Sequence, residues 1–193
     1  YKRQDVDKAF KEWRRAVESK GVFVFKEAFR QNDISGFCLA DPTFPVIYIN
    51  NSTPHTRQVF TLFHELAHLL LGTGGITKID ETYLRGIRGE NRQIEVLCNR
   101  FTAEFLVPDD DFSRHCRVHV SDQTIQDLSD RYSVSREVIL RKLYDRGLVG
   151  RSEYERKSQA WIADAQRRRR YGKAGDYYRN QAVYLGDTYM ALV

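Results

Sequence analysis

The sequence predicts an α+β fold, in which a small three-stranded sheet packs on two functional helices and a helical domain follows. Three observations lead to this prediction. Short segments rich in β-branched and aromatic residues are grouped within residues 22–49, apolar helical patterns follow them, and the second half of the chain is dominated by helical patterns. With 193 residues, the chain can form one sizeable core with an added module, or two small domains.

The first quarter of the chain supplies the predicted sheet. Residues 7–19 have the spacing of an amphipathic helix that ends at Gly21. Residues 22–25, 34–40 and 46–49 are the three predicted strands, and turn-forming residues separate them. An exposed edge of this sheet could hold a peptide segment as an added strand, although the sequence does not identify the edge strand.

The most informative segment follows the strands. Residues 57–70 read RQVFTLFHELAHLL, which places His64, Glu65 and His68 in an almost entirely apolar stretch. In this H-E-x-x-H pattern the two histidines are one helical turn apart, project from one face and can bind one metal ion. Burying the three groups without a partner would cost several kcal/mol, and a divalent cation removes that cost. The pattern therefore predicts a metal site on a helix.

A catalytic zinc site needs a third protein ligand and one open position. The candidate side chains after the motif are Asp80, Glu81, Glu90, Glu95, Cys98, Glu104, His115, Cys116 and His119. We favour Glu95, which opens a second helical pattern over residues 93–107. Glu104 is nine positions further on, so it points the opposite way and is expected to be solvated. Cys98, one turn from Glu95, is the rival ligand, although a buried free thiol is the commoner role for such a residue.

The second helical pattern also carries an apolar stripe. Its residues recur at helical spacing and are expected to face the core: Ile94, Leu97, Phe101 and Phe105. Between the two helical patterns, residues 72–90 contain five glycines and little periodicity, so they are predicted to form a loop beside the site.

Two motifs resemble a known family. The segments FTLFHELAHLLL and EVLCNRFTAEFLVP are similar to the ImmA/IrrE family of zinc metallopeptidases, whose members cut or control transcriptional repressors. The second motif is the more specific one, because H-E-x-x-H occurs in many unrelated peptidases. The resemblance implies a zincin-like fold in which His64, His68 and Glu95 hold one zinc ion, and it implies that Glu65 is the general base. Thr102 stands where alanine is usual in the family, which is a mild change.

Charge placement suggests how such a site would cleave a peptide bond. Zinc held by two neutral imidazoles and one carboxylate keeps a positive charge, which lowers the pKa of its water toward ~7 and polarises the scissile carbonyl. Glu65 would accept the water proton and later donate it to the leaving amine. The oxyanion donor is left open among four suitable side chains: Tyr48, Tyr83, His115 and His119.

Composition sets wider limits. The chain has 30% charged and 41% hydrophobic residues, no run of 18 apolar positions and no signal-like start, which predicts a soluble, cytoplasmic protein without membrane contact. Cys38, Cys98 and Cys116 are few and widely spaced, so we expect reduced thiols rather than a disulfide framework.

The two parts of the chain differ in charge. Residues 1–110 hold equal numbers of basic and acidic side chains, so the whole excess of +5 belongs to residues 111–193. Pro108 and the three aspartates after it supply a helix start, which favours a domain boundary at this place. The predicted domains are a zinc metallopeptidase domain over residues 1–110 and a helical C-terminal domain over residues 111–193.

Residues 121–147 have the outline of a helix-turn-helix, with an acidic-capped helix, a short turn and a second helix. In a DNA complex, Arg136, Arg141 and Lys142 would face the major groove. The four arginines at residues 167–170 would add phosphate contacts. Two helices joined by a tight turn are also the simplest way to build a small helical domain. We favour that interpretation, because the excess charge is only +5 and no dimerisation element is visible.

The resulting hypothesis is a zinc-dependent endopeptidase with one zinc ion per chain that acts on a protein substrate. The resemblance suggests a helix-turn-helix transcriptional repressor as that substrate, in a stress response or in the control of a mobile element. The alternative is a non-proteolytic regulator that binds DNA or a repressor, with zinc serving structure or sensing. The sequence leaves the oligomeric state open.

Overall fold

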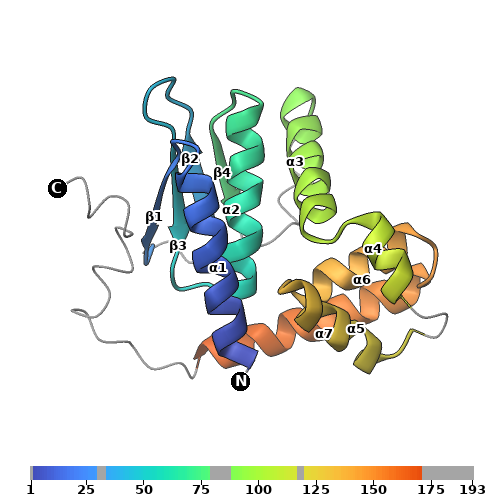
Figure 1. Ribbon diagram of the computed structural model, residues 1–193. Helices are drawn as coiled ribbons and strands as arrows, with labels where there is room; N and C mark the ends of the chain where they lie inside the picture. The colour runs from blue at the N-terminus through green and yellow to red at the C-terminus, as the bar shows by residue number, and fades with distance from the viewer. Residues whose placement is uncertain (1, 30–33, 79–87, 117–119, 171–193) are drawn as a thin grey trace.

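The computed structural model describes residues 2–29, 34–78, 88–116 and 120–170 of the chain. The strands are β1 (Phe23–Glu27), β2 (Ile34–Leu39), β3 (Val46–Asn50) and β4 (Gly75–Lys78). The helices are α1 (Lys2–Glu18), α2 (His55–Leu70), α3 (Glu90–Leu106), α4 (Asp109–His115), α5 (Asp122–Tyr132), α6 (Arg136–Asp145) and α7 (Arg151–Arg170). Figure 1 shows the sheet as one layer, with α1 and α2 over one face, α3 along α2, and α4 to α7 grouped beside the end of α3. The α+β class is therefore confirmed.

The sheet contains one strand more than the sequence predicts. Its order is β1-β3-β2-β4, in which β1 and β3 are parallel and β2 is antiparallel to both β3 and β4. The three predicted strands are present, with ends shifted by two residues or fewer. The prediction of a loop over residues 72–90 is wrong for β4, which lies within this range. This strand is too short to show a strand pattern in the sequence and is defined by its pairing with β2. Residues 79–87 of that loop lie outside the described part.

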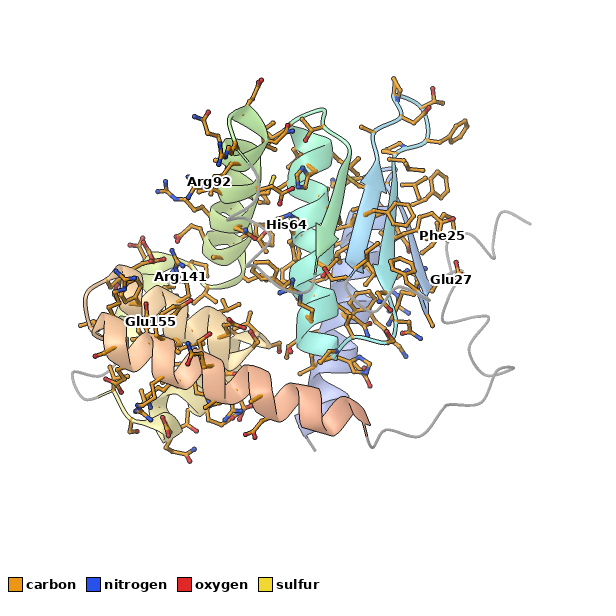
Figure 2. The ribbon with its side chains drawn as sticks, turned by 180° about the vertical axis from the view of Figure 1, so that it is seen from behind. Phe25, Glu27, His64, Arg92, Arg141 and Glu155 are labelled. Carbon is orange, nitrogen blue, oxygen red and sulfur yellow. The ribbon has the colours of Figure 1, made fainter. Side chains whose placement is uncertain are left out.

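The two faces of the sheet have different surroundings. Val24, Ile47 and Ile49 alternate along β1 and β3 and are buried beneath the helices. On the opposite face the rings of Phe37 and Tyr48 stack with centroids 4.9 Å apart, and Phe25 lies 5.2 Å from Tyr48. Figure 2 shows Phe25 on this outer face, away from the helices. The outer face is therefore a half-buried aromatic surface.

Gly36 in β2 allows α2 to lie close to the sheet. A Cβ atom at this position would lie 2.4 Å from the Thr61 methyl group and 2.7 Å from the Tyr48 carbonyl oxygen. Both distances are far below van der Waals contact, and the second involves the backbone, which cannot move aside easily. Any larger residue would push α2, and with it the H-E-x-x-H segment, away from β2.

The packing of α3 differs from the sequence prediction. The buried residues of this helix are Glu95, Cys98, Thr102 and Leu106. Leu97 and Phe105 of the predicted core-facing stripe are 51% and 44% exposed. The prediction that this stripe faces the core is therefore wrong for Leu97 and Phe105, whereas Ile94 and Phe101 are half-buried. The reason is that α3 turns Glu95, Cys98 and Thr102 toward α2, which presents two histidines.

The C-terminal helices have the local signals that the sequence predicts. Ser121 and Ser135 cap α5 and α6 by accepting hydrogen bonds from the Thr124 and Val138 amides. Ser133, between the two helices, has a left-handed backbone with φ 54°. The two helices and the turn predicted within residues 121–147 are thus present.

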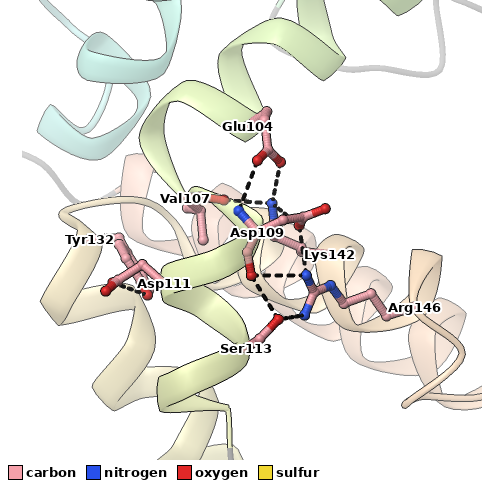
Figure 3. A network of polar contacts seen from close by, with 8 residues as sticks. All are labelled: Glu104, Val107, Asp109, Asp111, Ser113, Tyr132, Lys142 and Arg146. Carbon is pink, nitrogen blue, oxygen red and sulfur yellow. Dashed lines mark hydrogen bonds and ion pairs between the residues drawn. The ribbon is translucent and has the colours of Figure 1, made fainter.

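A polar network joins α3, α4 and α6, as Figure 3 shows. The Lys142 ammonium lies 2.9 Å from a Glu104 oxygen and 2.7 Å from an Asp109 oxygen, and it donates to the Val107 carbonyl at 2.5 Å. Arg146 also pairs with Asp109, at 2.9 Å. The network holds the start of α4 against α6.

The three cations considered for DNA contacts already have partners within the protein. Arg136 lies over the Trp161 ring at 4.6 Å, Arg141 pairs with Asp145 at 3.0 Å, and Lys142 is only 9% exposed. DNA binding by this segment stays a prediction, as does the domain division near residue 110. Among the helices that the structure describes, none combines the length and apolar character needed to cross a membrane.

Candidate metal centre

Helix α2 places two imidazoles together in the interior. His64 and His68 are one turn apart, and both are almost fully buried. Their Nε2 atoms face each other at 3.1 Å. Figure 2 shows His64 on the side of α2 that faces α3. Two ring nitrogens so close to each other can share a proton or bind one cation through their lone pairs.

Helix α3 adds a carboxylate to this pair. Glu95 is 8% exposed, its Oε2 lies 3.2 Å from His64 Nε2, and its Oε1 lies 3.3 Å from His68 Nε2. Of the residues that the structure describes, these three form the one group of histidine, cysteine or acidic side chains with ligand atoms close enough to share a metal ion. The structure therefore brings together the three side chains that the sequence singles out as metal ligands.

The spacing of the donor atoms suits a small divalent cation. Metal–nitrogen and metal–oxygen distances of 2.0–2.2 Å in a tetrahedral site place neighbouring ligand atoms roughly 3.3 Å apart. The separations here are 3.1, 3.2 and 3.3 Å. Two imidazoles and one carboxylate are also the donor set of many catalytic zinc sites. The residues present thus fit a metal ion of this kind.

Without a metal, a proton occupies this cluster. Burial lowers the pKa of His68, but hydrogen bonds with Cys98 and Glu95 and the charges on these groups raise it to about 10. His68 is therefore an imidazolium at neutral pH in the metal-free protein. A metal ion that binds through Nε2 must displace a proton, because a ligating imidazole has to offer a lone pair.

Glu65 lies on the side of α2 that faces the sheet. It is fully buried, and its Oε1 is 3.6 Å from the point where a Cβ atom of Gly36 would stand. The space left by Gly36 is therefore next to the carboxylate. Glu65 directly follows the candidate ligand His64 in the sequence, and its carboxylate packs against β2. Its role as a base stays a prediction.

None of the other candidate ligands that the structure describes belongs to the cluster. Glu90, Glu104, His115 and Cys116 lie elsewhere, and the rival Cys98 contacts His68 without joining the group of shared ligand atoms. Asp80, Glu81 and His119 fall outside the described residues. Thr102, the departure from the family pattern, donates its hydroxyl to the Cys98 carbonyl at 2.8 Å and leaves the three ligand positions unaffected.

Two of the suggested oxyanion donors have contacts elsewhere in the fold. Tyr48 lies on the outer face of the sheet, where it stacks on Phe37. His115 lies in α4, where its Nδ1 is 2.8 Å from the Asp111 carbonyl oxygen. Tyr83 and His119 fall outside the described residues. The choice of donor therefore stays open, with Tyr48 and His115 removed from it.

The structure also has a groove of about 1000 Å³ that the sequence did not predict. Its walls come from α2, α3, the start of α4, α6 and α7; they include Arg57 and Phe60 of α2 and Val96 and Leu97 of α3, but none of the three candidate ligands. Phe60 is one turn before His64, and Val96 directly follows Glu95. The exposed apolar side of α3 thus lines a hollow next to the metal ligands. The apolar stripe of residues 93–107 was the one sequence signal for this groove, but its helical spacing suggested that it faced the core.

Comparison with known proteins gives one positive finding. The family model Peptidase_M78, described as the IrrE N-terminal-like domain, matches residues 17–144. The matched range contains the sheet, both helices of the candidate metal centre, and α4 to most of α6. No curated protein matches the chain.

Proposed function

The chain belongs to the ImmA/IrrE family of metallopeptidases, and from this membership together with the geometry of the His64, His68 and Glu95 cluster we propose that it is a zinc-dependent endopeptidase. The family predicted from the two sequence motifs is thereby confirmed. The observation that carries the proposed activity is the convergence of two buried imidazoles and one carboxylate at 3.1–3.3 Å.

Each residue of the cluster has a role in this proposal. His64 and His68 would hold zinc through Nε2, and Glu95 would hold it through a carboxylate oxygen. When bound, zinc supplies a Lewis acid and lowers the pKa of a coordinated water. Glu65 would hold the proton in transit: its carboxylate would accept a proton from the attacking water and later give it to the leaving amine.

The fold also offers features that suit a polypeptide substrate. β4 is an edge of the sheet as far as the structure describes it, and it lies next to β2, the strand that Glu65 faces. An extended peptide can pair with such an edge through backbone hydrogen bonds. The groove lined by Phe60 and Val96 is then available for substrate side chains. A helix-turn-helix repressor as the substrate is inherited from the family resemblance alone.

The proposal is tested by replacing the base while keeping the ligands. Zinc-loaded protein is incubated with candidate helix-turn-helix repressors from the same genome, and cleavage is followed by mass spectrometry. Glu65→Gln is expected to lower the cleavage rate by about 10²–10⁴-fold, because the proton acceptor is lost. Zinc content should stay near one ion per chain in this variant.

A matched control is Glu12→Gln, which changes the same functional group on the exposed surface of α1, outside the groove, and is expected to cleave at the wild-type rate. Equal repressor control by the wild type and by Glu65→Gln would contradict the peptidase proposal. It would favour the alternative, a non-proteolytic regulator in which zinc has a structural or sensing role.

A further inference from the structure

The turn that ends α2 places the Thr73 hydroxyl next to His68, one of the three candidate metal ligands. Gly72 has a left-handed backbone with φ +67°, and its amide donates to the Leu69 carbonyl at 3.0 Å. The Thr73 amide donates to the His68 carbonyl at 2.9 Å. These two bonds form a Schellman motif, which glycine favours because it has no Cβ to clash in this conformation. The motif fixes Thr73 directly over the last turn that carries His68.

The Thr73 hydroxyl has two contacts, and both involve His68. Its Oγ1 donates to the His68 carbonyl oxygen at 3.2 Å, and it lies 3.1 Å from His68 Nδ1. A hydroxyl has a single hydrogen. If that hydrogen is donated to the carbonyl, Oγ1 can only accept from the ring, so Nδ1 must carry a hydrogen. The Nε2 atom, which faces His64 and Glu95, is then the nitrogen with a free lone pair in the neutral ring.

We propose that Thr73 is a positioning residue that holds His68 in the Nδ1–H form and so raises the affinity of the cluster for zinc. The inference rests on the proposed zinc site. The opposite arrangement, with the hydroxyl donating to Nδ1, would place the hydrogen on Nε2, where a metal ion has to bind. Only the Nδ1–H form satisfies both contacts of the hydroxyl, because the His68 carbonyl oxygen can only accept and a hydroxyl has one hydrogen to donate. A hydrogen bond to the far nitrogen of a ligating imidazole also fixes the ring orientation and increases its basicity.

The other imidazole has no such support. His64 Nδ1 is buried, and no hydrogen-bond partner for it exists among the described residues. Its ring is oriented by packing, with the Phe60 centroid 6.2 Å away. Thr73, in contrast, is tied to the sheet as well, because the Cys38 thiol donates to its carbonyl oxygen at 3.7 Å. At Nδ1, therefore, a hydrogen bond orients the His68 ring, whereas packing alone surrounds this atom of His64 among the described residues.

The experiment compares Thr73→Val and Thr73→Ser with the wild type. Zinc affinity is measured by competition with a chromophoric chelator, without any substrate. Thr73→Val keeps the shape of the side chain but removes the acceptor, so zinc affinity should fall by about 10–100-fold. Thr73→Ser restores the hydroxyl and should return the affinity to within about 3-fold of the wild type. Wild-type affinity in Thr73→Val would overturn the proposal.

Thr53→Val is the matched control. Thr53 is buried and donates its hydroxyl to the Asn50 carbonyl at 2.8 Å, but it has no contact with the histidines. The Thr53→Val variant loses a similar hydrogen bond, but its zinc affinity should be unchanged. An equal loss of affinity in both valine variants would also overturn the proposal, because the effect would then come from general destabilisation.

A second readout does not depend on any variant. The ring nitrogens of His68 in the zinc-loaded wild type are assigned by ¹⁵N NMR. A hydrogen on Nδ1 with metal at Nε2 supports the proposal, and metal at Nδ1 overturns it. These measurements need no cleavage, so a chain that binds zinc as expected and cuts no repressor would contradict the proposed peptidase activity alone.

Discussion

Two carboxylates of α3, Glu95 and Glu104, lie nine residues apart and on opposite sides of the helix, and their surroundings differ completely. Glu95 is 8% exposed and lies between two imidazoles. The Glu104 side chain is 54% exposed and pairs with the Lys142 ammonium, as Figure 3 shows. The same residue type therefore forms part of a candidate metal centre at one end of α3 and part of a structural ion pair at the other.

The difference comes from what the partner side chain can offer. An ammonium group has three donors and no lone pair, so Lys142 cannot be a metal ligand, and together with Arg146 it balances the charges of Glu104 and Asp109. An imidazole can lose its proton near neutral pH and then present a lone pair. A buried carboxylate next to imidazoles can thus exchange a proton for a cation, whereas a carboxylate next to lysine is already satisfied.

The largest expected effect separates the two carboxylates directly. Glu95→Ala removes a proposed ligand and should lower zinc affinity by at least about 100-fold, because the loss of residues that merely orient a ligand already costs 10–100-fold. Glu104→Ala should leave zinc affinity unchanged. Zinc per chain is measured by elemental analysis after dialysis against a weak chelator. Equal zinc content in the two variants would remove Glu95 from the ligand set.

The second effect concerns the ion-pair network. Lys142→Met keeps most of the aliphatic chain but leaves the buried Val107 carbonyl without the ammonium donor, which should destabilise the fold by about 1–3 kcal/mol. Zinc content should not change. Urea unfolding measures the free energy of unfolding. Arg141→Met is the control, because its pair with Asp145 is exposed and such pairs contribute about 0–1 kcal/mol. An equal loss in both variants would show that burial of the Lys142 network adds nothing.

The third effect is the opposite response of the two clusters to pH. In the metal-free protein the pKa of His68 is raised from 6.5 to about 10, so the stability that it contributes is complete below pH 6.5 and is lost as the pH rises toward 10. In the ion-pair network, a hydrogen bond with Lys142 holds the pKa of Asp109 below its usual 3.8. That contribution is present above pH 3.8 and is lost as the pH falls through the lowered pKa.

Thermal unfolding between pH 3 and pH 10 checks this comparison. Zinc-loaded protein should keep its melting temperature between pH 6.5 and 10 better than chelator-treated protein, because the metal has replaced the His68 proton. Asp109→Asn should reduce the loss on the acid side and leave the alkaline side unchanged. Parallel alkaline curves with and without zinc would contradict the assignment of that transition to His68.

Sequence alone determined the features that depend on local spacing. The distance of four residues between His64 and His68 fixes both rings on one helical face wherever that helix lies. The specific E-x-x-C-N segment identified the family and pointed to Glu95, which the structure places against both rings. An acidic helix start and a turn within residues 121–147 likewise marked α5 and α6 before any packing was considered.

Tertiary structure decided the features that depend on what lies opposite. Residues 93–107 show an apolar stripe, but α3 buries Glu95, Cys98 and Thr102 because α2 presents histidines to it. β4 exists as a strand only through its pairing with β2, and Thr73 reaches His68 only because Gly72 reverses the chain. Sequence periodicity shows which side chains share one face of a helix. The rest of the fold decides which element packs against that face, and therefore whether a carboxylate contacts a lysine or a pair of imidazoles.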